Sequence, residues 1–180
     1  WLTEQGHSPN AWVTLGAVAQ ATERIQLMTH VTCPTMRYHP AVVAQQAATL
    51  QLLSEGEHVV GDGWPSVHVR QEMLLEAITV IQELLTGELV TWEGEYFRVD
   101  SARVWDPAAV EIGVAVSGDA GIDRWGSIVD HMVATEPSPE LVELWDGEHG
   151  PGSRKIGQVP VCWAPTEEDA VRVAHEQFRW

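Results

Sequence analysis

Apolar residues recur along the first half of the chain with spacings typical of helices and of one short buried strand. The longest helical pattern covers residues 67–85. Similar patterns predict helices over residues 9–23 and 41–53. Between these two, residues 25–31 form a short apolar run with β-branched character, which favours a buried strand. The first half therefore predicts helices that pack against a strand.

The second half begins with a predicted hairpin and then repeats a strand-helix pattern. Two alternating runs around Glu93-Gly94 predict a small β-hairpin separate from the main sheet. Three further strands are predicted at residues 110–116, 129–135 and 156–163, with helices at about 119–128, 138–146 and 166–180. Regular alternation of this kind indicates a parallel sheet. A closed eight-fold barrel and an open doubly wound sheet both satisfy the pattern.

Composition narrows the class of protein and its partners. The 180 residues are 44% hydrophobic, enough for one domain with a continuous core. A formal net charge of −16 disfavours binding to nucleic acid or to anionic membrane surfaces. The two cysteines, Cys33 and Cys162, lie far apart and outside any zinc-binding spacing, which favours a reduced compartment. Without a long apolar run or a signal-peptide pattern, we expect a cytoplasmic protein.

Candidate chemistry lies just after the predicted strands, because ligands gather at the carboxyl ends of parallel strands. His30 at the first strand end can act as a base or cofactor contact, or can be a packed histidine. Ser117-Gly118 precedes a predicted helix, where backbone N–H groups can bind an anion, although a glycine there also serves backbone geometry. Thr135 with Glu136 follows a third strand.

Other chemistries lack their sequence markers. The eight histidines show no metal-ligand spacing, so we expect no metal site. Serine-hydrolase, phosphate-loop and Rossmann motifs are absent from the sequence. Three tryptophans in predicted loops, Trp1, Trp64 and Trp105, can stack on a planar ligand.

Several stretches of the sequence resemble luciferase-like oxidoreductases that depend on coenzyme F420, in the subgroup similar to F420-dependent glucose-6-phosphate dehydrogenase. The resemblance covers nearly the whole chain, including THVTCPTMRYHPAVVAQQAATLQLLSEG, EHVVGDGWP, EMLLEAITVIQELLTGELVTWEGEYFRVDSARVWD, IGVAVSGD, DHMVATEP and IGQVPVCW through AHEQFRW. It implies an α/β fold, the (β/α)8 TIM barrel of the luciferase-like type, incomplete as given. Residues 1–180 then form a single, partial barrel domain.

The resemblance also implies site residues. It places a non-prolyl cis peptide at His30-Val31, a bulge against the deazaflavin ring, with Thr32 beside it. The residues Ala115, Val116, Ser117 and Gly118 match the loop that receives the phosphate-bearing tail of the cofactor. Trp1 and Thr135 match substrate-binding positions.

Departures from the family pattern leave the catalytic residues unassigned. Relatives carry an Asp-His pair before the position of Trp1, whose histidine takes the alcohol proton. Between Gly56 and Glu57 they carry a strand and a glycine-rich loop with an acidic residue, and further strands follow the position of residue 180. Either this sequence is the ordered part of a longer enzyme, which we favour, or the barrel is truly shortened and its exposed strand edges favour oligomerisation.

The leading hypothesis is an F420-dependent oxidoreductase that transfers a hydride between the deazaflavin and a small organic substrate, an alcohol or sugar-like molecule. An FMN-dependent luciferase-like monooxygenase is one alternative. A non-catalytic barrel fragment or subunit is the other. The resemblance further implies a homodimer.

Overall fold

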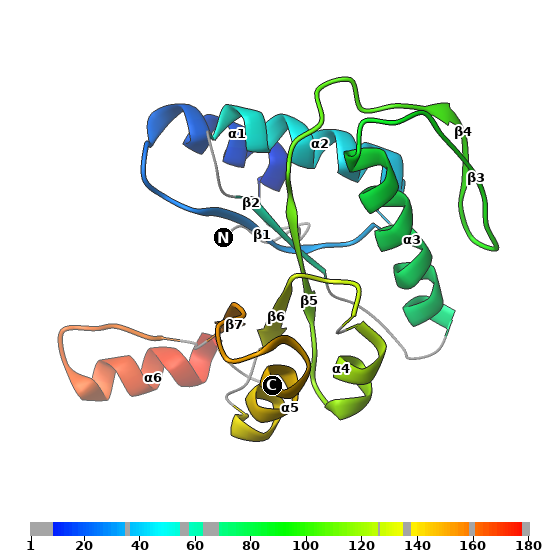
Figure 1. Cartoon of the computed structure of the whole chain (residues 1–180). Coiled ribbons are helices and arrows are strands. Elements are labelled where there is room, and N and C mark those ends of the chain that lie inside the picture. The colour runs from blue at the N-terminus through cyan, green and yellow to red at the C-terminus, as the bar shows by residue number, and fades with distance from the viewer. Residues whose placement is uncertain are drawn as a thin grey trace.

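The computed structural model contains a parallel sheet whose strands follow one another in chain order (Figure 1). It describes residues 9–34, 37–54, 58–62, 69–125, 127–134, 138–158 and 161–177. The five strands of this sheet lie in the order β1-β2-β5-β6-β7, and each pairs in parallel with its neighbour. Their bounds are β1 Leu27–Thr32, β2 His58–Asp62, β5 Glu111–Ala115, β6 His131–Ala134 and β7 Lys155–Gly157.

The strand order decides between the two architectures that the sequence leaves open. A doubly wound sheet reverses its order at a switch point, whereas a barrel adds each strand on the same side of the last one. The described strands advance in one direction throughout. The sheet is therefore an arc of a β/α barrel.

Helices α1 to α5 line one face of this sheet, and α6 follows β7 without joining that layer. Their bounds are α1 Ala11–Ala21, α2 Pro40–Leu53, α3 Val69–Leu85, α4 Asp119–Trp125, α5 Pro139–His149 and α6 Glu167–Gln177. Successive strand residues point to opposite faces. Met132 accordingly belongs to the main core with the helices, while Val133 joins a second cluster with Met28 and Ile156. The second cluster marks the inner face of the barrel.

Local sequence chemistry sets where helices begin. The side chain of Asn10 accepts a hydrogen bond from the N–H of Val13 at 3.1 Å and caps α1. Helices α2 and α5 both start with a proline, which tolerates the first helical position because it needs no N–H there. Ser138 caps α5 by accepting from the N–H of Leu141 at 3.3 Å.

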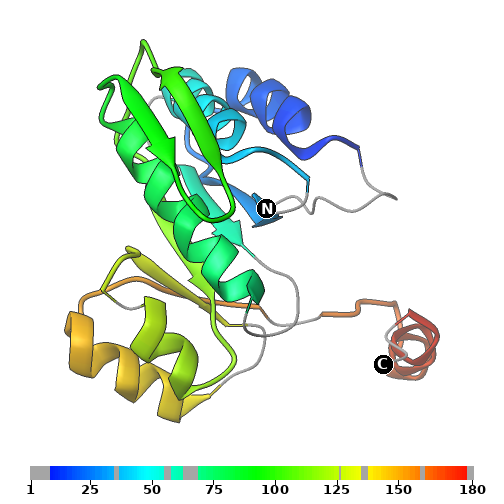
Figure 2. The ribbon, with the colours of Figure 1, turned by 90° about the vertical axis from the view of Figure 1, so that its right-hand side faces the viewer.

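The predicted hairpin is confirmed and lies outside the main sheet (Figure 2). Strands β3 (Val90–Glu93) and β4 (Arg98–Ala102) pair antiparallel. The carboxylate of Glu76, on α3, binds the hairpin turn to the helix through hydrogen bonds. It accepts hydrogen bonds from Trp92 Nε1 at 3.0 Å and from the backbone N–H groups of Glu95, Tyr96 and Phe97 at 3.1, 3.0 and 2.9 Å.

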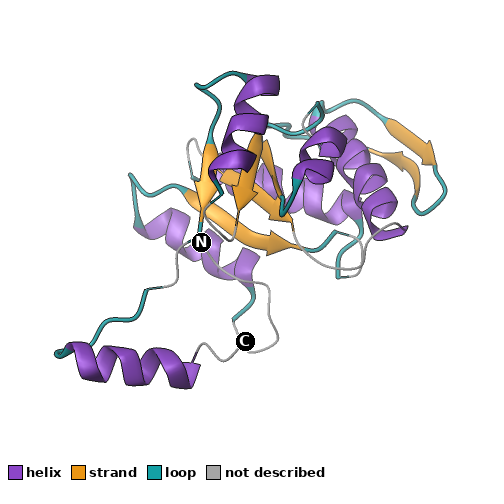
Figure 3. Cartoon of the chain, turned by 90° about the horizontal axis from the view of Figure 1, so that it is seen from below, coloured by secondary structure: helices purple, strands orange, loops and turns teal. Residues whose placement is uncertain are grey.

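Two expectations about the chain need correction, whereas the helix predicted over residues 166–180 is confirmed as α6 over Glu167–Gln177. Strand β2 was not predicted, although it pairs on both sides in the sheet. Strand β7 ends at Gly157, far short of the predicted limit at residue 163. Helix α6 stands apart from the sheet (Figures 1 and 3), and its approach segment leaves Val161 and Trp163 78% and 83% exposed.

No helix among the described residues combines the length and apolar character needed to cross a membrane.

Candidate functional site

The carboxyl ends of the five parallel strands meet at one edge of the sheet, where β/α barrels place their ligand sites. The strands end at Thr32, Asp62, Ala115, Ala134 and Gly157. Two of the predicted cofactor segments, 30–32 and 115–118, lie at this edge. They come from β1 and β5, which are separated by β2 alone.

The end of β1 departs from regular strand geometry. Its register with β2 shifts between His30 and Thr32, so the backbone is irregular at the predicted cofactor contact. Thr32 is fully buried, and its hydroxyl donates a hydrogen bond to the hydroxyl of Thr29 at 2.8 Å. The side chains of His30 and Val31 lie outside the described part of the structure.

The segment after β5 divides into a packed half and an open half. The N–H of Val116 donates to the carbonyl of Val133 at 2.9 Å, and its side chain is buried in the main core. Ser117 is exposed, and a Cβ atom added to Gly118 would meet nothing within 4 Å. No protein atom fills the space beside the backbone of Gly118, and this free space is compatible with a phosphate-bearing cofactor tail. The carboxylate of Asp119, the first residue of α4, accepts a hydrogen bond from the N–H of Ala120 at 3.0 Å.

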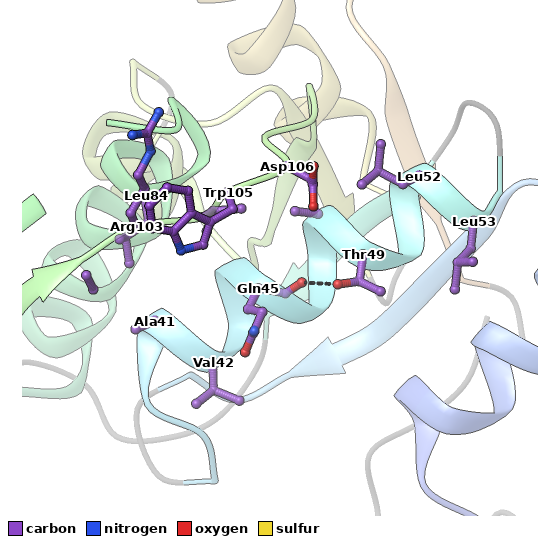
Figure 4. Close-up of a pocket in the computed structure, with 13 residues that line it drawn as sticks. Ala41, Val42, Gln45, Thr49, Leu52, Leu53, Leu84, Arg103, Trp105 and Asp106 are labelled. Atoms are coloured by element: carbon purple, nitrogen blue, oxygen red, sulfur yellow. Dashed lines mark hydrogen bonds between the residues drawn. The ribbon is translucent and has the colours of Figure 1, made fainter. Parts of the chain in front are cut away.

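The predicted aromatic contacts do not gather at this edge within the described residues. Trp105 lines a different hollow, a pocket of about 550 Å³ between α2 and the connection from β4 to β5 (Figure 4). There the guanidinium of Arg103 lies 4.9 Å from the centroid of the indole. This connection enters the amino end of β5, so stacking of Trp105 on a ring at the carboxyl edge is excluded by its position. Trp1, Trp64 and Thr135 fall outside the described residues.

A second polar cluster lies at the opposite, amino ends of β5 and β6. Glu111 Oε2 lies 2.8 Å from Nε2 of His131 and 3.4 Å from an Nη atom of Arg154. The His131 side chain is 8% exposed. Polar groups at the amino face of a barrel usually serve stability. This histidine is therefore a packed residue rather than a member of the candidate site.

Sequence reasoning missed one residue of the edge. Asp62 ends β2, where its backbone pairs with Thr32 of β1 and with Val114, the residue before Ala115, of β5. The signal was a charged residue two positions after Val59-Val60, a pair of β-branched residues of the kind that favours strands.

A parallel sheet in chain order, with helices on one face, defines part of a β/α-barrel protein. The model of the Luciferase-like monooxygenase family matches residues 1–180, and the chain belongs to that family.

Named relatives and solved structures agree with this assignment. The chain is 40% identical over 157 residues to the F420-dependent glucose-6-phosphate dehydrogenase of Microbacterium testaceum (strain StLB037), covering 78% of this chain and 47% of the relative. It is 36% identical over 149 residues to the F420-dependent hydroxymycolic acid dehydrogenase of Mycobacterium tuberculosis (strain H37Rv), covering 74% and 41%. This chain thus spans less than half the length of either relative.

Among solved structures, an F420-dependent secondary alcohol dehydrogenase in complex with an F420-acetone adduct superposes with a TM-score of 0.81 at 30% identity. The match covers 94% of this chain and 60% of that one. An FMN-bound Baeyer–Villiger monooxygenase from Pseudomonas putida superposes with a TM-score of 0.73 at 17% identity, over 97% of this chain and 60% of that one. At this low identity the match shows a shared fold and nothing more. The predicted luciferase-like barrel, incomplete in this chain, is confirmed.

Proposed function

We propose that the whole protein is an F420-dependent oxidoreductase that moves a hydride between the deazaflavin and an alcohol or sugar-like substrate. The observation that carries this proposal is the 36–40% identity to two dehydrogenases that are both named for that cofactor. The acetone adduct in the similar solved structure supports a small alcohol or ketone as the substrate class. We also propose that the protein forms a homodimer and that it lies in the cytoplasm.

The cofactor, when bound, supplies the hydride chemistry. The chain's own contribution is to bind and orient it across the edge between β1 and β5. The backbone of His30, Val31 and Thr32 would meet the ring, and Ala115 to Gly118 would receive the tail. Trp1 and Thr135 remain proposed substrate contacts.

Binding of coenzyme F420 to the whole protein is the direct test. Fluorescence titration is expected to give saturable binding, with FMN competing poorly. Binding of FMN with the absorption spectrum of a bound flavin, in place of F420, would favour the monooxygenase alternative. Failure to bind either one would favour a non-catalytic subunit and overturn the proposal.

Gly118→Ala is expected to weaken F420 binding about tenfold or more, roughly 1.4 kcal/mol. The reason is steric. The added methyl group meets no protein atom within 4 Å, so the fold tolerates it, but it occupies the space proposed for the cofactor tail. Titration of the variant, with thermal unfolding in parallel, measures both effects.

Gly147→Ala is the matched control, because a Cβ there also meets nothing within 4 Å but lies in α5, away from the strand ends. Its F420 affinity should equal that of the wild type. Equal affinity in Gly118→Ala would remove this loop from the cofactor site.

A further inference from the structure

Helices α1 and α2 differ from the other helices in their charge. Neither contains an aspartate, glutamate, lysine or arginine over its 11 or 14 residues. Helices α3 to α6, by contrast, each carry an acidic residue in the first turn. A surface helix of a globular protein normally turns charged residues toward water. Two neighbouring helices without charges, in a chain with a net charge of −16, therefore indicate a surface that another molecule covers.

The outward side chains of these two helices form one uncharged surface. On α2 the exposed residues Val42, Gln45, Thr49 and Leu52 follow one another at intervals of three, four and three positions (Figure 4). This is the spacing by which two helices pack along a seam. On α1, Val13 is 73% exposed, and a hollow of about 290 Å³ between the two helices is lined by uncharged residues. These five residues define the α1–α2 face.

The rest of the barrel would leave the α1–α2 face open. The outer strands of the sheet are β1 and β7, so further strands of a longer chain would join beyond one or the other. Helix α2 lies between α1 and α3 and packs against both. Elements added at the outer strands lengthen the layer of helices sideways and do not reach the outward side of α2. The covering molecule is therefore a separate chain.

Charge favours a second copy of this protein as that chain. Two copies with a net charge of −16 each repel one another wherever their acidic surfaces meet. In a two-fold dimer the same patch meets itself, so a charge near the axis faces its own sign. A patch without charges avoids this repulsion. A basic partner would instead bind the acidic surface, because charge complementarity steers association and the α1–α2 face offers it none.

We propose that two copies of the protein pair through the α1–α2 face, with α2 of one copy packed against α2 of the other. This proposal names the surface of the homodimer proposed above and rests on that part of the proposed function. Gln45 and Thr49, in the middle of the α2 stripe, then lie nearest the two-fold axis. Val42 and Leu52 lose their contact with water on either side of them.

Leu52→Glu in the whole protein tests the surface, with the dissociation constant of the dimer measured by analytical ultracentrifugation. We expect this constant to rise at least about 30-fold, because each copy would bury a carboxylate in the interface. Val13→Glu makes the same test from α1 and covers the case in which Leu52→Glu does not fold. Fluorescence titration with F420 reports whether each variant is folded.

Leu144→Glu is the matched control. Leu144 lies on α5 and is 46% exposed, close to the 53% of Leu52, so the same change is made on another helix at similar exposure. This variant should dimerise like the wild type.

A pair of opposite charges tests whether α2 meets α2. Thr49→Glu and Thr49→Lys should each weaken the dimer, because each places like charges near the axis. Mixing equal amounts of the two should restore dimers that contain one copy of each, which native mass spectrometry detects by mass. Absence of such mixed dimers would overturn the pairing of α2 with α2.

The outcomes separate this proposal from the proposed function. A monomeric wild type that binds F420 ends the homodimer and leaves the oxidoreductase proposal standing. A dimeric wild type, beside Leu52→Glu and Val13→Glu variants that dimerise equally well, overturns the α1–α2 face alone. A dimer weakened by Leu52→Glu and Leu144→Glu to the same extent would also overturn it, since the effect would then come from added charge and not from the surface.

Discussion

Trp145→Ala is expected to lower the free energy of unfolding by about 3–5 kcal/mol, the usual range for removing a large buried aromatic residue. Trp145 is fully buried in the main core. Its ring stacks on His149 with centroids 3.8 Å apart, and its Nε1 donates to the hydroxyl of Ser153 at 2.9 Å. The substitution therefore opens a cavity and leaves a hydroxyl group without its donor. Urea unfolding followed by circular dichroism measures the loss.

Trp105→Ala provides the matched control for this effect. Its side chain is 77% exposed, so the same change of residue type should alter stability by less than about 0.5 kcal/mol. A similar loss in both variants would contradict the assignment of Trp145 to the core.

Removing the Glu76 carboxylate is expected to cost about 2 kcal/mol, since hydrogen bonds to a charged group are worth more than neutral ones. Glu76→Ala would leave the indole of Trp92 and three backbone N–H groups of the turn without their acceptor. Gly94→Ala should do comparable damage, because its new Cβ would lie 1.7 Å from the present position of Glu76 Oε1. Urea unfolding of the two single variants measures both losses.

A double-mutant cycle tests whether the two changes act on one feature. In a Glu76→Ala background, much of the clash at Gly94 is gone, so the two losses should sum to clearly more than the loss in the double variant. If the loss in the double variant equals the sum of the two single losses, the Glu76 carboxylate is not what stabilises the turn.

The same carboxylate should make stability depend on pH. Partial burial alone would raise the pKa of Glu76, but the hydrogen bonds from Phe97, Trp92, Tyr96 and Glu95 outweigh it and hold the pKa below its usual range. A lowered pKa in the folded state stabilises the protein above the unfolded-state value, and this stabilisation is lost as pH falls through the folded-state value. Wild type and Glu76→Gln should therefore differ at neutral pH and converge in acid. Unfolding curves between about pH 6 and pH 3 give the free energy of unfolding of both proteins. Subtracting one from the other at each pH cancels the contributions of the other carboxylates, which the two proteins share.

Elements with a long and consistent apolar pattern were predictable from the sequence. Helix α3 was predicted over 67–85 and runs from Val69 to Leu85, because its apolar stripe continues over several turns. Strand β2 escaped prediction because it has five residues, ends in Gly61-Asp62 and gains its hydrogen bonds from two distant partners. Strand β7 was predicted too long, since an apolar run that includes Pro160 cannot donate every ladder hydrogen bond.

The candidate site was predictable in part, for a related reason. Strand ends can be located once strands are predicted, and this placed residues 30–32 and 115–118 at one edge. Local pattern does not tell which loop tryptophan reaches that edge, and Trp105 lies elsewhere because its segment leads into the amino end of β5. Asp62 could be placed only after the register of β2 was known.

The chain-order sheet also has a kinetic consequence. Each ladder joins strands that are far apart in the sequence, and β2 meets β5 only after α3 and the hairpin have been spanned, so that Val60 pairs with Ile112. Closing such loops costs chain entropy before any ladder bond rewards it, and folding slows as this sequence separation grows. The helices can form locally and early. The β2–β5 pairing, which brings the two proposed cofactor segments to either side of Asp62, is therefore the costliest loop closure in the sheet, so the candidate site assembles late in folding.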